Sequence, residues 1–397
     1  MKAVVWHGKR DVRVDTVPDP TIQTPTDAII RVTSSGLCGS DLHLYEVLAP
    51  FMTEGDILGH EPMGIVEAVG SEVTHIAPGD RVVVPFNIAC GSCAMCSTGL
   101  QSQCETTQVR EHGKGAALFG YTKLYGQVPG GQAEYLRVPQ AHYGPIKVPD
   151  GPPDDRFVYL SDVLPTAWQA VKYADVPKGG SVVVLGLGPI GSMACRVAAH
   201  LGAGTVIGID RVPERLERAR QHGATVLDLE EFGGDRELAV AAVAELTSGG
   251  ADAVIDAVGM EAHGSAGAKA MQMMTGLMPN RAAEGLMKRA GVDRLAALLM
   301  AIDMVRRGGT ISIVGVYGGM TDPLPMMVLF DKQIQLRMGQ ANVRRWVADL
   351  LPLVAERDVL QVEDFASHHL PLDAAPAAYE MFQKKTDNTI KVLFHPA

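Results

Sequence analysis

The sequence lacks long hydrophobic runs, and its basic residues are outnumbered by acidic ones. No apolar run approaches the roughly 20 residues that a membrane-spanning helix needs, so we expect no membrane partner. Lys and Arg total 35 against 45 Asp and Glu, which gives a net charge of −10 with no basic cluster. Because nucleic-acid-binding surfaces concentrate positive charge, we also expect no nucleic-acid partner.

Cysteine is scarce, and its distribution is uneven. Four of the six cysteines fall in residues 90–104, CGSCAMCSTGLQSQC, with the spacing C-x2-C-x2-C-x7-C. Disulfides of a secreted protein fit poorly, since Met1 is followed by the strand-like KAVVW and not by an apolar signal segment, and we expect a cytoplasmic protein. Four thiolates in one short loop are suited instead to tetrahedral zinc, which leaves no position for a substrate. The predicted ligands of this structural zinc are Cys90, Cys93, Cys96 and Cys104.

The length of 397 residues is large for one hydrophobic core and predicts two domains. Residues 1–150 are rich in Val, Ile, Thr and Gly with frequent turn signals, which predicts a β-rich domain. The strands expected in this domain include residues 3–6, 28–34, 64–70 and 80–86.

Beyond this domain, strands alternate with helices. Residues 181–185, SVVVL, form a continuous apolar run, as expected of a strand buried on both faces. Strands separated by helices of about ten residues or more indicate βαβ units, so we predict an α/β protein with a doubly wound parallel sheet. Further strands are expected at 205–209, 224–229, 252–259 and 310–316, with helices ending near His200, at 213–222, at 235–247 and ending near Arg307.

The last part of the chain predicts an amphipathic helix at 343–356 and a closing strand at 389–394 that could return to the first domain. We therefore expect one domain from residues 1–162 and 341–397 and a second from 163–340. An insert at about 260–297, rich in Met, Ala and Gly, interrupts the sheet pattern, and either contact with a neighbouring subunit or a cover over a cofactor fits it.

A glycine-rich hexapeptide, GLGPIG at residues 186–191, lies between a predicted strand and a predicted helix. The spacing is weak evidence alone, but this context is typical of dinucleotide-binding turns. Gly186 permits the tight turn, Gly188 lets a pyrophosphate approach, and Gly191 lets helix and strand pack closely. The pyrophosphate then meets free N–H groups at the helix N-terminus. The predicted cofactor-binding residues of the turn are Gly186, Gly188, Pro189, Ile190 and Gly191.

Asp210 ends the next strand, 19 residues after Gly191. A carboxylate at this place accepts hydrogen bonds from the adenosine ribose and repels a 2′-phosphate, so NAD is favoured over NADP. The adjacent Arg211 represents the alternative, since a guanidinium there can bind the 2′-phosphate.

One of the two remaining cysteines indicates a second metal site. Cys38 lies in the polar turn SSGLCGSDLHLY (34–45), and GHE occupies residues 59–61. A lone cysteine is more often buried and inert, but a thiolate and an imidazole are two good zinc ligands. A catalytic zinc needs three protein ligands and one open position.

The motifs together resemble those of one family. GHEPMGIVEAVG (59–70), the CGSDLH turn (38–43), the four-cysteine loop and the dinucleotide segment occur in the order seen in zinc-dependent medium-chain alcohol dehydrogenases. The resemblance covers essentially the whole chain. It implies a GroES-like catalytic domain joined to a Rossmann domain with the active site in the cleft between them, and a homo-oligomer, either a dimer or a tetramer.

The resemblance implies that Cys38 and His60 bind a catalytic zinc, with Glu61 beside them, so that two zinc ions are expected per chain. Where the best-known members place a third ligand, a cysteine, this chain has YLSDVLPTAWQA (159–170) with Asp162. An aspartate there resembles the glutathione-independent formaldehyde dehydrogenases and makes Asp162 the expected ligand. The alternative is that Asp162 only caps the following helix, in which case Glu61 is the third ligand.

The resemblance also implies a proton relay, in which the Ser40 hydroxyl takes the substrate's proton and passes it through the nicotinamide ribose to His43. Lys391 matches a family position whose basic side chain reaches the cofactor phosphate, although lysines near a C-terminus are often only solvated. The implied activity is hydride transfer between NAD and a small alcohol or aldehyde hydrate. The alternatives are an aldehyde dismutase or similar enzyme that keeps NAD bound, and a non-enzymatic nucleotide-binding protein.

Overall fold

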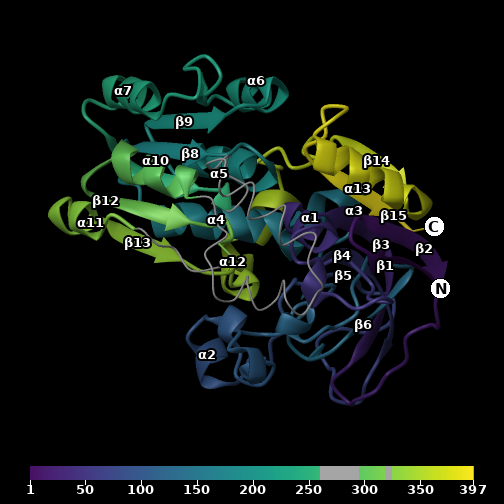
Figure 1. Cartoon of the computed structure of the whole chain (residues 1–397). Helices are drawn as coiled ribbons and strands as arrows, with labels where there is room; N and C mark the ends of the chain where they lie inside the picture. Colours follow the sequence, from purple (N-terminus) through teal and green to yellow (C-terminus); the bar gives the residue numbers. More distant parts are fainter. Residues whose placement is uncertain (260–294, 318–323, 397) are drawn as a thin grey trace. The chain divides into compact units, whose positions relative to one another are not determined.

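The structure is a computed structural model that describes residues 1–259, 295–317 and 324–396. The chain forms two compact units, one of Met1–Pro165 with Ala341–Ala397 and one of Thr166–Gln340 (Figure 1). Residues 260–294 of the expected insert lie outside the described residues. Within the described ranges, no helix combines the length and the apolar character needed to cross a membrane.

The first unit is built on a seven-stranded sheet in the order β14-β15-β3-β4-β5-β7, with β6 paired to β3. Its longest strand, β3 (Ala28–Leu37), pairs antiparallel with β4 (Glu61–Val69). The closing strand of the chain, β15 (Val392–His395), pairs antiparallel with the other edge of β3 and so belongs to this sheet. The remaining strands are β5 (Arg81–Val83), β6 (Tyr135–Val138), β7 (Ile146–Lys147) and β14 (His368–Pro371), with a separate antiparallel pair of β1 (Lys2–Gly8) and β2 (Asp11–Thr16).

The amphipathic helix expected at 343–356 is α12 (Val343–Ala355). Its buried residues recur every three or four positions, at Val343, Trp346, Leu350 and Val354, which is the spacing of one helix face. The other helices that begin in this unit are α1 (Gly39–Tyr45), α2 (Ala94–Ser97), α3 (Asp154–Phe157), α13 (Ala375–Lys384) and α4 (Val163–Ala174), within which the unit boundary falls.

The second unit contains a six-stranded parallel sheet in the order β10-β9-β8-β11-β12-β13. In this doubly wound order the first strand, β8 (Ser181–Leu185), lies beside the fourth, β11 (Ala251–Asp256). The other strands are β9 (Thr205–Asp210), β10 (Thr225–Asp228), β12 (Val305–Ile313) and β13 (Gln335–Met338). The described helices are α5 (Pro189–His200), α6 (Pro213–Gln221), α7 (Arg236–Leu246), α10 (Ala296–Met304) and α11 (Met326–Asp331).

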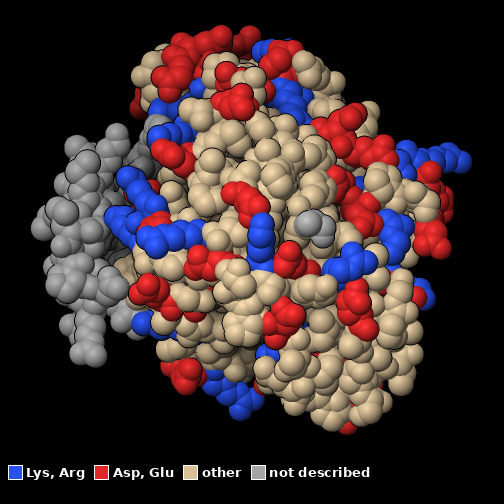
Figure 2. Space-filling model, turned by 90° about the vertical axis from the view of Figure 1, so that its right-hand side faces the viewer, with Lys and Arg blue, Asp and Glu red and all other residues tan. Residues whose placement is uncertain are grey.

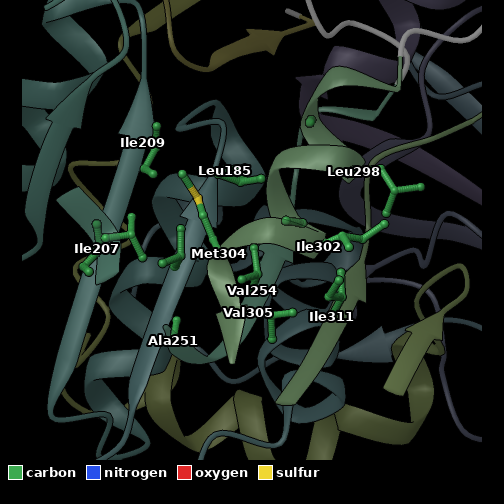
Figure 3. Close-up of a cluster of buried hydrophobic side chains, with 14 of the residues drawn as sticks. Leu185, Ile207, Ile209, Ala251, Val254, Leu298, Ile302, Met304, Val305 and Ile311 are labelled. Carbon is green, nitrogen blue, oxygen red and sulfur yellow. The ribbon is translucent and has the colours of Figure 1, made fainter. Parts of the chain in front are cut away.

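The core of the second unit lies between its sheet and its helices. Figure 3 shows Leu185, Ile207 and Val254 on neighbouring strands, together with Leu298 and Ile302 of α10. Burying each such side chain stabilises the folded state by about 1.5–3 kcal/mol. This core therefore stabilises the strands whose ends carry the nucleotide turn.

One helix boundary differs from the expectation. The helix expected to end near Arg307 ends at Met304, and β12 begins at Val305. Val305 pairs with Ala251 of β11, so the backbone here joins the sheet. Arg306 and Arg307 favour a helix only weakly, because helix propensity is a small local preference. Pairing with the neighbouring strand overrides it.

Charged side chains of both signs are scattered over one face of the molecule. On the face drawn in Figure 2, Asp and Glu are interspersed with Lys and Arg among larger areas of other residues. Exposed pairs include Lys2 with Asp373 and Arg13 with Asp11, each 2.7 Å apart. Because exposed pairs contribute only about 0–1 kcal/mol each, the stability of the fold depends mainly on its cores.

Candidate active site and metal centres

The turn between β3 and α1 carries the first predicted site residues. Cys38 follows the end of β3, while Ser40 and His43 lie three residues apart on α1 and so face the same way. The Oδ2 atom of Asp41 accepts a hydrogen bond from the Cys38 backbone N–H at 3.0 Å, which stabilises the first turn of the helix. This turn therefore holds the Cys38 thiol in a defined place.

Four predicted residues meet in one buried cluster. Cys38, His60, Glu61 and Asp162 each offer a ligand atom, and these atoms all lie within 4.8 Å of one another. Asp162 Oδ2 lies 3.7 Å from Cys38 Sγ and 3.4 Å from His60 Nε2. Glu61 begins β4 and His60 directly precedes that strand, while Asp162 directly precedes α4. Thiolate, imidazole and carboxylate are the ligand types of zinc, so this set of donors fits that ion.

The electrostatics of the cluster also favour a bound cation. Burial, together with the charges of Glu61 and Asp162, raises the pKa of the Cys38 thiol to about 11. Burial likewise raises the pKa of Glu61, whose Oε1 has no hydrogen-bond partner among the described residues. A divalent cation reverses both effects, because it stabilises a carboxylate and deprotonates a coordinating thiol.

Glu61 has a second charged neighbour, Lys391. The Lys391 ammonium donates to Glu61 Oε2 at 2.5 Å and to the Leu37 carbonyl at 3.0 Å, and both charged side chains are 0% exposed. Burial lowers the pKa of Lys391, but the charges of Glu61 and Cys38 outweigh burial and raise it. Gly36 makes this packing possible, since a Cβ there would lie 2.2 Å from Glu61 Oε2. The interpretation of Lys391 as a solvated lysine is therefore wrong, whereas its role at a cofactor phosphate stays a prediction.

Asp41 is a site residue that the sequence reasoning missed. Its Oδ1 lies 3.1 Å from His60 Nδ1, and its Oδ2 accepts a hydrogen bond from Gln132 Nε2 at 3.3 Å. Burial lowers the pKa of His60, but Asp41 and Asp162 outweigh burial and raise it well above its usual value. A carboxylate behind a metal-binding imidazole fixes which nitrogen faces the metal, here Nε2. The sequence feature that could have indicated Asp41 is its position inside the CGSDLH turn, between Cys38 and His43.

The Ser40 hydroxyl lies at the edge of the cluster, 3.2 Å from His60 Nε2. Ser40 and His43 are both partly exposed, whereas the cluster itself is buried. Phe86 and Tyr121 stand edge-on to the His60 ring, with centroids 6.4 and 6.3 Å away. These rings keep water from the imidazole, which strengthens electrostatic interactions there. No sequence motif marked Tyr121.

The four-cysteine loop forms a second metal centre in the first unit. Cys93 Sγ and Cys104 Sγ lie 3.9 Å apart. Zinc–sulfur bonds of about 2.3 Å in tetrahedral geometry separate sulfurs by about 3.8 Å, which fits this pair. Burial raises the pKa of Cys90, but hydrogen bonds, led by one from Thr106, outweigh it and lower the pKa well below its usual value. The residues whose sulfurs lie within 4.8 Å of one another are Cys90, Cys93, Cys96 and Cys104.

In the second unit, the GLGPIG turn follows β8 and opens α5. Gly186 has φ +81°, a left-handed conformation that glycine adopts without strain. A Cβ on Gly191 would lie 1.7 Å from the Gly186 carbonyl oxygen, so that position requires glycine. Among the described residues, a Cβ at Gly188 would meet only Arg215 Nη1, at 3.7 Å, which leaves room in front of the α5 N–H groups. Open space at a helix N-terminus suits a pyrophosphate.

Asp210 connects the end of β9 to this turn. Its carboxylate accepts hydrogen bonds from the backbone N–H groups of Leu187 at 2.6 Å, Arg211 at 2.7 Å and Val212 at 3.0 Å. These bonds fix the Asp210 carboxylate beside the GLGPIG turn, because Leu187 belongs to that turn.

Two arginines lie beside Asp210. The Arg211 guanidinium is 3.4 Å from the carboxylate of Glu230, which follows β10 in the chain. Arg215 of α6, which no motif marked, has Nη1 3.9 Å from Asp210 Oδ2. Arg215 therefore places a guanidinium, a group that can bind a 2′-phosphate, near Asp210. The guanidinium of Arg211 is instead paired with Glu230.

Two family models match the chain and define its class. Residues 24–150 match the alcohol dehydrogenase GroES-like domain, and residues 189–276 match the zinc-binding dehydrogenase model. The predicted fold class, a GroES-like domain followed by a Rossmann sheet, is confirmed.

Individual proteins resemble the chain over its full length. It is 42% identical to the uncharacterized zinc-type alcohol dehydrogenase-like protein AdhB of Bacillus subtilis, with 100% of both chains covered. It is 33% identical to formaldehyde dismutase of Pseudomonas putida, over 96% of this chain and 95% of that one. The structure of alcohol dehydrogenase TADH from Thermus sp. ATN1 matches with TM-score 0.83 and 36% identity over 100% of both chains. This chain belongs to the zinc-type, medium-chain alcohol dehydrogenase family and is an alcohol dehydrogenase-like oxidoreductase.

Proposed function

We propose that the protein transfers hydride between NAD and a small alcohol or aldehyde hydrate. The observation that carries this proposal is the buried cluster of Cys38, His60, Glu61 and Asp162 with the Ser40 hydroxyl beside it. Zinc, when bound by Cys38, His60 and Asp162, supplies Lewis-acid chemistry that lowers the pKa of a substrate hydroxyl.

The side chains around the cluster orient groups and move a proton. Asp41 orients His60 so that Nε2 faces the cluster. The Ser40 hydroxyl takes the proton of the substrate hydroxyl, and His43, farther along α1, is the final acceptor of that proton. In the second unit, the N–H groups at the start of α5 would hold the pyrophosphate of NAD, and Asp210 would accept hydrogen bonds from the ribose hydroxyls. NAD, when bound there, would supply the acceptor for the hydride of the substrate.

An assay of NAD reduction with a panel of alcohols and hydrated aldehydes tests this function. We expect turnover of at least one of these compounds by a protein with two zinc ions per chain, and its loss in a Ser40→Ala variant. Inactivity across the panel, by protein that holds zinc at both centres and binds NAD, would instead favour a nucleotide-binding role.

The resemblance to formaldehyde dismutase favours a second candidate, an aldehyde dismutase that keeps its NAD bound. One aldehyde hydrate would give hydride to NAD and a second aldehyde would take it back, so no cofactor is consumed. Denaturing the purified protein and assaying the supernatant for NAD separates the candidates. Stoichiometric release supports the bound cofactor, and absence of nucleotide rules it out.

Asp162 is proposed as the third zinc ligand. An Asp162→Ala variant should lose roughly 10²-fold or more of kcat/KM, because a missing ligand weakens the catalytic ion, while the zinc of the cysteine loop remains. The matched variant is Glu61→Gln, which keeps the size of the neighbouring acid and should retain zinc at the cluster. An active Asp162→Ala protein beside a zinc-depleted Glu61→Gln protein would assign the ligand role to Glu61.

Asp210 is proposed to select NAD. An Asp210→Gly variant should raise the KM for NAD roughly tenfold to hundredfold, since hydrogen bonds to a charged group are worth about 1.5–3 kcal/mol, and should lower the KM for NADP. Asp228→Gly is the control, because Asp228 ends the neighbouring strand β10 opposite Asp210. Unchanged preference in Asp210→Gly would show that the cofactor assignment is wrong.

We propose a homo-oligomer formed through the edge of the second unit's sheet. The edge strand β13 and the preceding α11 expose large apolar side chains, with Met327 at 75%, Phe330 at 80% and Met338 at 58%. Apolar patches of this kind are typical of interfaces. A Phe330→Glu variant should sediment as a smaller species than wild type. The control Leu238→Glu, at an exposed leucine of α7, should sediment like wild type. If the Phe330→Glu variant assembled like wild type, the interface would have to lie on another surface.

A further inference from the structure

A third group of metal-ligand side chains lies in the first unit, separate from both centres described above. Asp155 of α3, His369 of β14 and His395 of β15 each offer a ligand atom to it. Asp155 Oδ2 lies 2.9 Å from His369 Nδ1 and 3.4 Å from His395 Nε2, and the two nitrogens are 3.4 Å apart.

These distances match a small metal ion. Metal–ligand bonds of about 2.0–2.1 Å at the tetrahedral angle separate the ligand atoms by about 3.3 Å. The two imidazole rings are stacked, with planes that differ by 6° and centroids 5.7 Å apart, and the facing nitrogens are 3.4 Å apart. Binding of one ion requires the rings to rotate about their side-chain bonds until both lone pairs point at it.

The strand register brings the two histidines together. In the parallel pair of β14 and β15, His369 lies opposite Leu393 and Pro371 lies opposite His395. His395 is thus two positions beyond the partner of His369, and side chains two positions apart share one face of a sheet. Figure 1 shows β14 and β15 at the end of the chain, next to β3.

Neighbouring groups orient the ligands. The Nδ1 atom of His395 is 3.3 Å from the Thr33 carbonyl oxygen. A carbonyl only accepts, so Nδ1 carries the proton and Nε2 presents its lone pair to the group. Asp155 Oδ1 accepts a hydrogen bond from Ser34 Oγ at 2.8 Å, which leaves Oδ2 for the ion. Metal-binding histidines and carboxylates are oriented in this way by their outer neighbours.

We propose that Asp155, His369 and His395 bind a divalent transition-metal ion such as Zn²⁺, with water completing the coordination. Two imidazoles and one carboxylate suit zinc, nickel or copper, whereas magnesium and calcium prefer oxygen ligands alone. The side chains of His369 and His395 are 46% and 37% exposed, so the ion enters from solvent. It fastens the last strand of the chain to β14 and to α3.

Zinc binding by untagged protein tests the proposal. Total zinc per chain is measured at saturating free Zn²⁺ in wild type, His369→Ala and His395→Ala, and thermal unfolding is followed with and without added Zn²⁺. The matched control is His368→Ala. His368 is adjacent to His369 and pairs with Asp387 at 3.0 Å, but it lies outside the three-residue group.

We expect each of the two variants to bind one zinc fewer than wild type and to lose the zinc-dependent rise in melting temperature. The His368→Ala control should keep both. Equal zinc content in wild type, His369→Ala and His395→Ala would overturn the proposal. The readout is a difference between variants at one exposed group, so it does not depend on whether the catalytic assignment is correct.

Discussion

A Cys38→Ala variant is expected to hold one tightly bound zinc fewer per chain than wild type and to lose about 10³-fold or more of kcat/KM. The reason is that metal-ion catalysis is worth several kcal/mol of transition-state stabilisation, and every 1.4 kcal/mol is tenfold in rate. Cys38 supplies the only thiol of the cluster, while His60, Glu61 and Asp162 supply an imidazole and two carboxylates. Metal analysis after transfer to metal-free buffer, with steady-state kinetics, measures both effects.

The control is Cys195→Ala, which removes the other cysteine outside the four-cysteine loop. Cys195 is buried in α5 and belongs to none of the three metal-ligand groups among the described residues. This variant should keep wild-type zinc and most of its activity. If Cys38→Ala retained full zinc and activity, the catalytic site would not be the Cys38 cluster.

A Lys391→Met variant should lower the free energy of unfolding of the first unit by about 3–5 kcal/mol, because it leaves the Glu61 carboxylate buried without its cation. Both partners of this ion pair are 0% exposed, so water cannot replace the lost ammonium. Calorimetry of the zinc-loaded protein should show the change as a lower melting temperature. The carbonyl of Leu37 also loses its donor, which acts in the same direction.

Two further proteins separate the buried pair from general effects. A Lys2→Met variant breaks the pair with Asp373, whose partners are 51% and 61% exposed, and should change the melting temperature little because solvent screens this pair. The double variant Glu61→Gln with Lys391→Met removes both charges and should recover much of the lost stability. A Lys391→Met protein as stable as the Lys2→Met protein would contradict the assigned role of the ion pair.

The features that the sequence predicted well are local ones. The cysteine loop and the GLGPIG turn both depend on residue types at short spacings. The structure brings the four cysteine sulfurs within 4.8 Å of one another and places Gly186 and Gly191 where a side chain would be strained or would clash. The prediction of a helix end near Arg307 was wrong because strand pairing, a long-range interaction, outweighed local propensity. Tyr121 and Arg215 went unnoticed because neither belongs to a motif, and their importance comes only from what they contact.

The sequence by itself determined the family, the two-part fold class and the identity of the cysteine loop, because short motifs with strict spacing carry each of them. Only the tertiary structure decided the charge environment of the cluster. Lys391 and Glu61 are 330 positions apart in the chain, yet they form a fully buried pair. The group of Asp155, His369 and His395 likewise depends on the register of β14 and β15. Contacts of this kind join distant segments through a shared sheet, and no short stretch of sequence encodes them.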